Sequence, residues 1–153
     1  MHRLPFPENY AHVDNSTSTK TEAKKSPGGE IRIYEGPFSR FWLDEYGILH
    51  AQSQNIPRTL QGQKDTTALI GQITGNKKVC MLADTTLASP MDKEVRLYVA
   101  REMPSIFNAV AVISSSVLGR FFGNLFVGLK NNLVPMKLFT NEEEAITWLK
   151  QYL

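Results

Sequence analysis

Three short runs of apolar residues in the second half of the chain predict β-strands. Val79–Ala83 and Ala109–Ile113 are apolar without alternation, which is typical of strands buried on both faces of a sheet. Met136–Phe139 is expected to form the last strand. Segments with helical spacing separate these runs, and strands that alternate with helices indicate a parallel arrangement.

Four helices are expected, because apolar residues recur at helical spacing and capping residues stand at the ends. The first should bury Leu60, Thr67, Ile70 and Thr74, and the last should bury Ala145, Leu149 and Tyr152. The four are Pro57–Thr74, ended by Gly75; Pro90–Met103, ended or kinked by Pro104; Val117–Leu129, capped by Ser114, Ser115 and Ser116; and a final helix capped by Thr140, with Glu143 three residues later.

A hairpin precedes the first helix. Arg40–Leu43 and Ile48–Gln52 flank Asp44–Gly47, and Gly47 is available for the positive φ that such a turn uses. A preceding edge strand is expected around Ile31 and Ile33. The fold class is therefore α/β: a mixed β-sheet with helices, in the order β-β-β-α-β-α-β-α-β-α.

The first 29 residues differ in composition from the rest. Asp14–Gly29 is polar and almost free of aliphatic residues, so it buries too little surface to offset the entropy lost on ordering. We expect residues 1–29 to be a flexible tail and residues 30–153 to form one domain.

Composition excludes several classes of function. The net charge is +2 without a dense basic patch, which argues against a nucleic-acid partner. A single cysteine, Cys80, rules out an internal disulfide framework and fits a reducing cytoplasm; we expect it to be a buried, inert thiol. No signal peptide or transmembrane segment is expected. His50 is expected to be half-exposed, and no cysteine or histidine spacing predicts a metal or cofactor site.

The junction between the strand at Val79–Ala83 and the following helix is the main candidate site. The order of strand, loop and helix start should bring four side chains around one helix N-terminus, where ligands dock in open α/β sheets. Asp84 and Asp92 also suit acid–base chemistry or Mg²⁺, although both positions are common structural choices for aspartate. The candidates are Asp84, Thr85, Asp92 and Glu94, with Lys93 between the last two.

Val117–Leu129 and the residues before it supply two further candidates. Hydroxyls and a guanidinium at a helix start suit an anion, and ordinary capping with a solvated arginine is the alternative. Aromatic side chains beyond one buried stripe suit a second subunit of a homodimer or an apolar ligand, and burial within the monomer is the alternative. The anion candidates are Ser114, Ser115 and Arg120, and the apolar candidates are Phe122 and Phe126.

Three pieces of the sequence resemble STAS domains of the SpoIIAA-like, or STAS/SEC14-like, branch. They are the hairpin, the strand that ends at Asp84 and is followed by Met91-Asp92, and the ending KLFTNEEEAITWLKQYL. The resemblance implies a STAS-like fold and a bacterial regulatory domain. In STAS regulators, Asp-Ser-Ser/Thr-Gly opens a helix, and the second hydroxyl residue accepts phosphate. Asp92 matches the aspartate, but Lys93 and Glu94 replace both hydroxyl residues, so a phosphorylation switch of that kind is not expected.

Three hypotheses about function follow. The preferred one is a non-catalytic, cytoplasmic regulatory module that binds a protein partner, with Glu94 either mimicking a phosphorylated acceptor or favouring the helix start. The second is a binding or carrier domain for a small apolar or amphipathic ligand, which the SEC14-like resemblance implies. The third is a hydrolase-type enzyme that uses Asp84 and Asp92.

Overall fold

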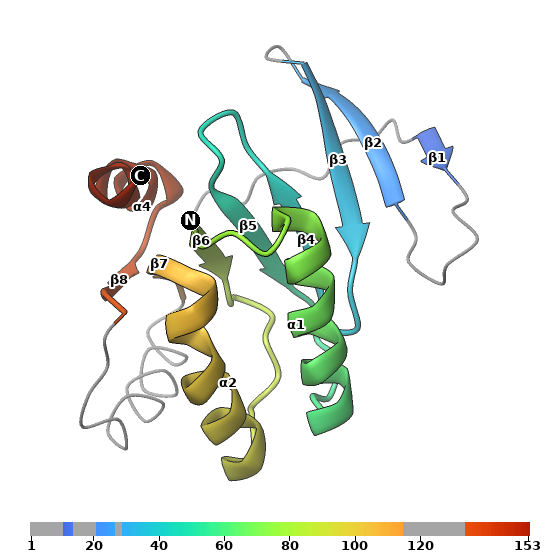
Figure 1. Cartoon of the computed structure of the whole chain (residues 1–153), viewed down its shortest axis with the longest axis vertical. Coiled ribbons are helices and arrows are strands. Elements are labelled where there is room, and N and C mark those ends of the chain that lie inside the picture. The colour runs from blue at the N-terminus through green and yellow to red at the C-terminus, as the bar shows by residue number, and fades with distance from the viewer. Residues whose placement is uncertain (1–10, 14–20, 27–28, 115–133) are drawn as a thin grey trace.

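The computed structural model describes residues 11–13, 21–26, 29–114 and 134–153. Within these ranges the strands form one eight-stranded sheet, in the same order in space as in the sequence (Figure 1). The strands are β1 Ala11–Val13, β2 Thr21–Ser26, β3 Gly29–Glu35, β4 Ser39–Leu43, β5 Leu49–Ser53, β6 Val79–Asp84, β7 Phe107–Ile113 and β8 Met136–Phe139.

The sheet is antiparallel from β1 to β5 and parallel from β5 to β8. Antiparallel neighbours need only short connections, whereas parallel neighbours need a crossover. The helices α1 (Leu60–Thr74) and α2 (Lys93–Ile106) form the crossovers that follow β5 and β6. The predicted mixed α/β sheet is confirmed, and so is the hairpin turn, in which Gly47 has a φ of 77°.

The N-terminal strands β1 and β2 lie within residues 1–29, where the sequence predicted a flexible tail. β2 pairs with β3 along its whole length, from Thr21 opposite Tyr34 to Ser26 opposite Gly29. The expected domain boundary at residue 30 therefore falls inside β3. Antiparallel strands pair through backbone hydrogen bonds, which any residue except proline can form. The polar composition of the segment therefore does not predict whether it pairs with β3. Whether the domain needs this segment stays a prediction.

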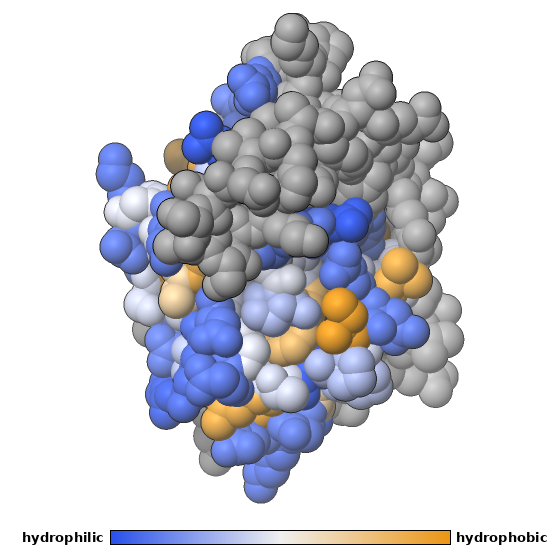
Figure 2. Space-filling model, turned by 90° about the vertical axis from the view of Figure 1, so that its right-hand side faces the viewer, coloured by the Kyte–Doolittle hydropathy of each residue, from blue (hydrophilic) through white to orange (hydrophobic). Residues whose placement is uncertain are grey.

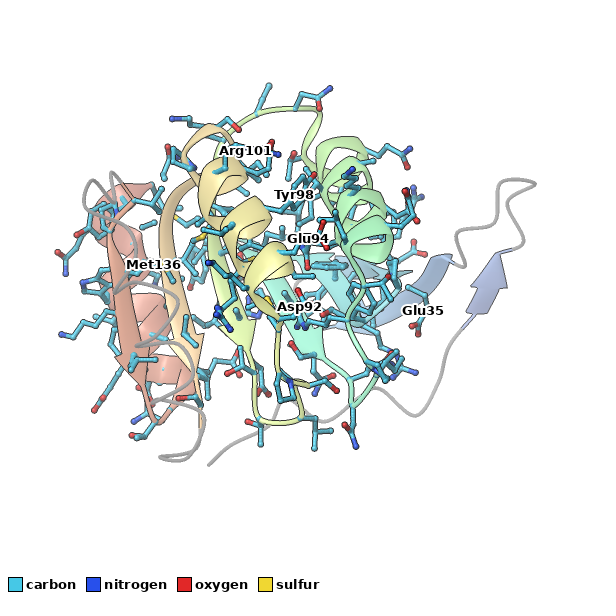
Figure 3. All side chains as sticks on the ribbon, turned by 90° about the horizontal axis from the view of Figure 1, so that it is seen from below. Glu35, Asp92, Glu94, Tyr98, Arg101 and Met136 are labelled. Atoms are coloured by element: carbon cyan, nitrogen blue, oxygen red, sulfur yellow. The ribbon has the colours of Figure 1, made fainter. Side chains whose placement is uncertain are left out.

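Two apolar cores form on the opposite faces of the sheet. α1 and α2 lie side by side over one face (Figures 1 and 3), where Phe41, Leu49 and Val110 pack against the helices. On the other face, Cys80, Ala111 and Leu149 belong to the core under α4 (Glu142–Leu149), which a short 3₁₀ helix, Lys150–Tyr152, follows. Both faces of β6 and β7 are thus covered, as their unalternating apolar sequences predicted.

Side-chain caps set the helix starts, and these differ from the predicted boundaries. Thr59 and Asp92 are extended and accept hydrogen bonds from the amides of Gly62 and Val95, so α1 and α2 begin three residues later than predicted. Asn141, not Thr140, caps α4, because its Oδ1 accepts from the Glu144 amide. Pro104 does not end α2 at Met103, since the helix continues to Ile106; Gly75 ends α1 as predicted, with a φ of 64°.

The inner faces of the helices were predicted with mixed success. Ala145 and Leu149 are fully buried, and Tyr152 packs against the same core at its edge. In α1 the prediction placed Thr67 and Thr74 inside, whereas the buried residues are Gly62, Gln63, Thr66, Leu69 and Ile70. The predicted stripe lies to one side of the buried face, which contains a glycine and two polar residues that the apolar spacing does not include.

The helix predicted at Val117–Leu129 lies outside the described residues, as do the candidates Ser115, Arg120, Phe122 and Phe126. Among the helices that the structure describes, none has the length and apolar character needed to cross a membrane.

Candidate functional site

A cavity of about 110 Å³ lies between the sheet and the two helices α1 and α2. Strands β4 to β8 form its floor, and both helices cover it. Most of its lining is apolar, and six of its side chains are polar or charged. The apolar lining includes Phe41, Met81, Val99, Met103, Phe107 and Val110, and the polar lining consists of Ser39, Ser53, Arg58, Gln63, Thr66 and Thr85.

The polar side chains gather at one end of the cavity. Ser53 is the last residue of β5, Thr85 directly follows β6, and Arg58 lies in the loop that leads into α1. This is the edge at the carboxyl ends of the parallel strands, where open α/β sheets usually bind ligands. At the opposite edge, Phe107 and Met136 begin β7 and β8 and supply apolar lining. The cavity is therefore amphipathic along the direction of the strands.

Arg58 is the charged residue of this cavity. Its Nη2 donates to Ser53 Oγ at 3.1 Å, and its Nη1 donates a longer hydrogen bond to Gln63 Oε1 at 3.4 Å. The guanidinium carbon lies 5.6 Å from the centre of the Phe38 ring. Burial lowers the pKa of the Arg58 guanidinium from its ordinary value, because desolvation disfavours the charged form.

The hydrogen bonding of this polar end is incomplete. Arg58 Nε is buried without a hydrogen-bond partner. In the part of the chain that the structure describes, no carboxylate lies within ion-pair distance of Arg58. Thr66 and Thr85 already donate their hydroxyl hydrogens to the carbonyls of Gly62 and Ile113. The cavity therefore contains a half-buried cation whose hydrogen-bond acceptors are a neutral hydroxyl and a neutral amide group.

The predicted site residues near β6 separate into different environments. Thr85 is buried and lines the cavity. The Asp84 carboxylate accepts hydrogen bonds from the amide and hydroxyl of Thr86, and it lies on the α4 side of the sheet. Asp92 caps α2 on the other side. Each carboxylate is thus bound to its own turn.

The start of α2 is a solvent-exposed surface. Asp92, Lys93 and Glu94 are all exposed, and Figure 3 shows Asp92, Glu94 and Tyr98 following one another along the helix. Leu97, which follows Glu94 by almost one turn, is 57% exposed. Ser114 is buried just after β7. The predicted residues near β6 therefore do not form one site. Thr85 lines the cavity, Asp84 orders the turn after β6, and the remaining three lie at the exposed start of α2.

A second polar cluster lies under the start of α4. His50 Nε2 is 2.8 Å from Asp44 Oδ2, and the His50 ring stacks on Trp42 with centroids 5.1 Å apart. His50 Nδ1 is 3.8 Å from Glu142 Oε1, which is too long for a hydrogen bond. The prediction of a half-exposed His50 is wrong: the residue is 3% exposed, because α4 packs over this face of the sheet.

This second cluster leaves little room for a ligand. The space between His50, Gln52, Asp84 and Glu142 is about 10 Å³, roughly what one water molecule requires. Within the described ranges, no group of three or more histidine, cysteine, aspartate or glutamate side chains could hold a metal ion. The larger cavity is therefore the candidate site.

Sequence reasoning identified Thr85 and missed the other five polar residues of this site: Ser39, Ser53, Arg58, Gln63 and Thr66. The sequence placed Arg58 in the first turn of the predicted helix Pro57–Thr74, where a charged residue is usually solvated, whereas the structure places it in the loop before α1. Gln63 and Thr66 are spaced as neighbours on one helix face, and two polar residues beside Ile70 are the only hint that this face is not purely apolar.

Comparisons with known proteins identify the family without assigning an activity. Among curated proteins, none matches this sequence. Among solved structures, the chain is similar to an uncharacterized protein of the DUF3478 family with a SpoIIAA-like fold from Shewanella loihica PV-4. The sequences are 15% identical, the match covers 90% of this chain and 98% of that chain, and the TM-score is 0.46. The family model "Domain of unknown function (DUF7793)" matches residues 41–153, and the chain therefore belongs to this family.

Proposed function

We propose that this protein is a non-catalytic domain that binds a small amphipathic ligand in the cavity between the sheet and helices α1 and α2. The observation that carries the proposal is the division of one cavity into a polar end around Arg58 and an apolar end around Phe107 and Met136. Binding sites for small molecules are mostly apolar and contain a few convergent polar groups that fix orientation.

The size of the cavity limits the ligand. An apolar protein cavity of roughly 150 Å³ accommodates benzene. A volume of about 110 Å³ therefore suits a ligand whose hydrocarbon part is about the size of benzene, such as a chain of five or six carbons, and not a long lipid chain.

The arrangement of the carboxylates supports a binding role over catalysis. The hydrolase hypothesis requires Asp84 and Asp92 to act together on one substrate. Their side chains are instead committed to separate turns on opposite sides of the sheet.

A ligand titration followed by backbone amide NMR tests the proposal, with hexanoate and hexanol as probes. Both probes combine a polar end with a short apolar chain. We expect at least one of them to shift the amide signals of the residues around the cavity in β5, β6 and α1. Shifts confined to exposed loops, or no shifts with either probe, would contradict the proposal.

A pair of matched variants localises the binding. Ala51 lies on β5 and lines the cavity, so Ala51→Leu should fill part of the space and reduce the binding of the probes. Ala68 is exposed on α1, and Ala68→Leu should leave binding unchanged. If both variants bind the probes equally well, the probes bind outside the cavity.

A second candidate function is the regulatory module that contacts a protein partner through the start of α2. Leu97 and Glu94 favour it, because both are exposed and lie almost one turn apart on α2, so that one partner surface can contact an apolar and a charged side chain together. On the face shown in Figure 2, apolar side chains form small groups separated by hydrophilic ones. With a native partner in hand, Leu97→Glu and Glu94→Ser should both weaken binding while the fold is retained; unchanged affinity would rule out this surface.

A further inference from the structure

The Arg58 guanidinium lacks an anion. It is half-buried, its hydrogen-bond acceptors are a serine hydroxyl and a glutamine amide, and its Nε is buried without a partner. A charge removed from water costs free energy unless an opposite charge and hydrogen bonds compensate it. Elsewhere in the described chain, Arg40 and Arg101 do have carboxylate neighbours, namely Glu35 and Glu102.

We propose that the anion is supplied by the ligand, and that the cavity binds a small monocarboxylic acid with its carboxylate at Arg58 and Ser53. This inference rests on the proposed function and names the class of ligand. The hydrocarbon part of the acid lies between the sheet and α2, against Val99, Phe107 and Val110.

The chemistry of the polar end favours a carboxylate. An ionised carboxylate has only acceptor atoms, and a planar guanidinium offers donors in a matching geometry. Ser53 Oγ accepts from Arg58 and so keeps its own hydrogen available to donate. An alcohol or amide of the same length would fit the apolar end equally well but would leave the cation without a counter-charge.

The shape of the cavity favours an acid with a hydrocarbon tail over an inorganic anion. Most of the lining is apolar, and its far end is formed by Met103, Phe107 and Met136. Inorganic phosphate would satisfy Arg58 and leave this apolar surface without contact. A short aliphatic or aromatic acid occupies both ends.

Isothermal titration calorimetry with hexanoate, hexanol and inorganic phosphate tests the inference. The proteins are the wild type, Arg58→Met, and the control Arg101→Met, whose arginine is exposed on α2 and does not line the cavity. Hydrogen bonds to charged groups contribute enough to expect hexanoate to bind wild type about 10- to 100-fold more tightly than hexanol. Phosphate should bind more weakly than hexanoate.

Arg58→Met should lose this preference. It keeps an unbranched side chain and removes the charged guanidinium, so hexanoate affinity should fall to that of hexanol while hexanol binding is unchanged. Arg101→Met should behave like the wild type. Circular dichroism and thermal unfolding of each variant separate a lost contact from a lost fold, and Arg58→Lys, which restores the charge, should recover part of the preference.

The outcomes distinguish this inference from the proposed function. If hexanoate and hexanol bind the wild type equally, the cavity binds amphipathic molecules and the inference about the anion is wrong. If phosphate binds as tightly as hexanoate, the site recognises charge alone and the hydrocarbon part of the inference is wrong. If neither organic probe binds, both the proposed function and the inference are wrong.

Discussion

His50 Nε2 on β5 lies 2.8 Å from Asp44 Oδ2, which joins the two sides of the β4–β5 hairpin beneath α4. The other oxygen of Asp44 accepts hydrogen bonds from the amides of Tyr46 and Ile48. One carboxylate therefore orders the turn and satisfies a buried ring nitrogen. This arrangement orders the hairpin whose second strand, β5, is the first of the parallel strands.

Asp44→Ala should lower the free energy of unfolding by about 1–3 kcal/mol, because it leaves a buried histidine nitrogen without its partner and removes the acceptor of two turn amides. Asp44→Asn keeps an acceptor for those amides and should cost less. Urea denaturation of both variants measures the difference. Asp65→Ala is the control, since Asp65 is exposed and accepts a hydrogen bond from the exposed Gln61; a loss as large in this control would refute the role assigned to Asp44.

Gly62→Ala should destabilise the protein, although alanine favours a helix. A Cβ at Gly62 would overlap the Phe38 ring, which also packs against the Arg58 guanidinium. We expect a cost of about 1–3 kcal/mol from overpacking. Gly71→Ala, in the same helix, would meet only the end of the Asn76 side chain and should have a smaller effect. Thermal unfolding compares the two, and equal stabilities would show that Phe38 can move aside.

Glu142 should make the wild type less stable as the pH rises. Burial, followed by the nearby carboxylates of Asp84 and Asp44, raises the pKa of the Glu142 carboxyl, and His50 partly opposes the shift. The unfolded chain releases this proton at about pH 4.3, before the folded protein does, so stability falls as the pH rises from there through the raised pKa.

The variant Glu142→Gln lacks this titration. Its melting temperature relative to that of the wild type should therefore increase between about pH 4.3 and neutral pH. Glu143→Gln changes an exposed carboxylate on the same helix turn and provides the matched control. A difference between wild type and Glu142→Gln that stays constant with pH would contradict the shift.

Deletion of residues 1–28 should leave the domain folded. The buried apolar residues of the described core begin at Ile33, and β2 is an added antiparallel strand beside β3. The melting temperature should change by no more than a few degrees, measured by differential scanning calorimetry. A loss of more than roughly 8 °C, which corresponds to about 2–4 kcal/mol or more for a chain of this size, would show that the N-terminal strands stabilise the domain.

Local sequence patterns predicted the order of the described elements from the hairpin to α4, and the helix expected at Val117–Leu129 lies outside them. Val79–Ala83 and Ala109–Ile113 form strands because such runs are stable only when buried, and Gly47 and Gly75 have the positive φ angles expected of them. Caps were less well predicted, since Thr140 and Asn141 can each cap a helix and only the backbone path selects one. Burial of Cys80 was also predicted; its residual exposure is 1%, and burial raises the pKa of its thiol.

The tertiary structure alone decided which side chains meet. Arg58 reaches Ser53 and Gln63 because the loop after β5 returns over the edge of the sheet, and Glu142 approaches His50 because α4 packs across the opposite face. Side chains alternate between faces along each strand, so Ser53 faces the cavity while Gln52 beside it faces α4. Strand register and helix packing depend on contacts between residues that are distant in sequence, and the local periodicity of the sequence cannot predict such contacts.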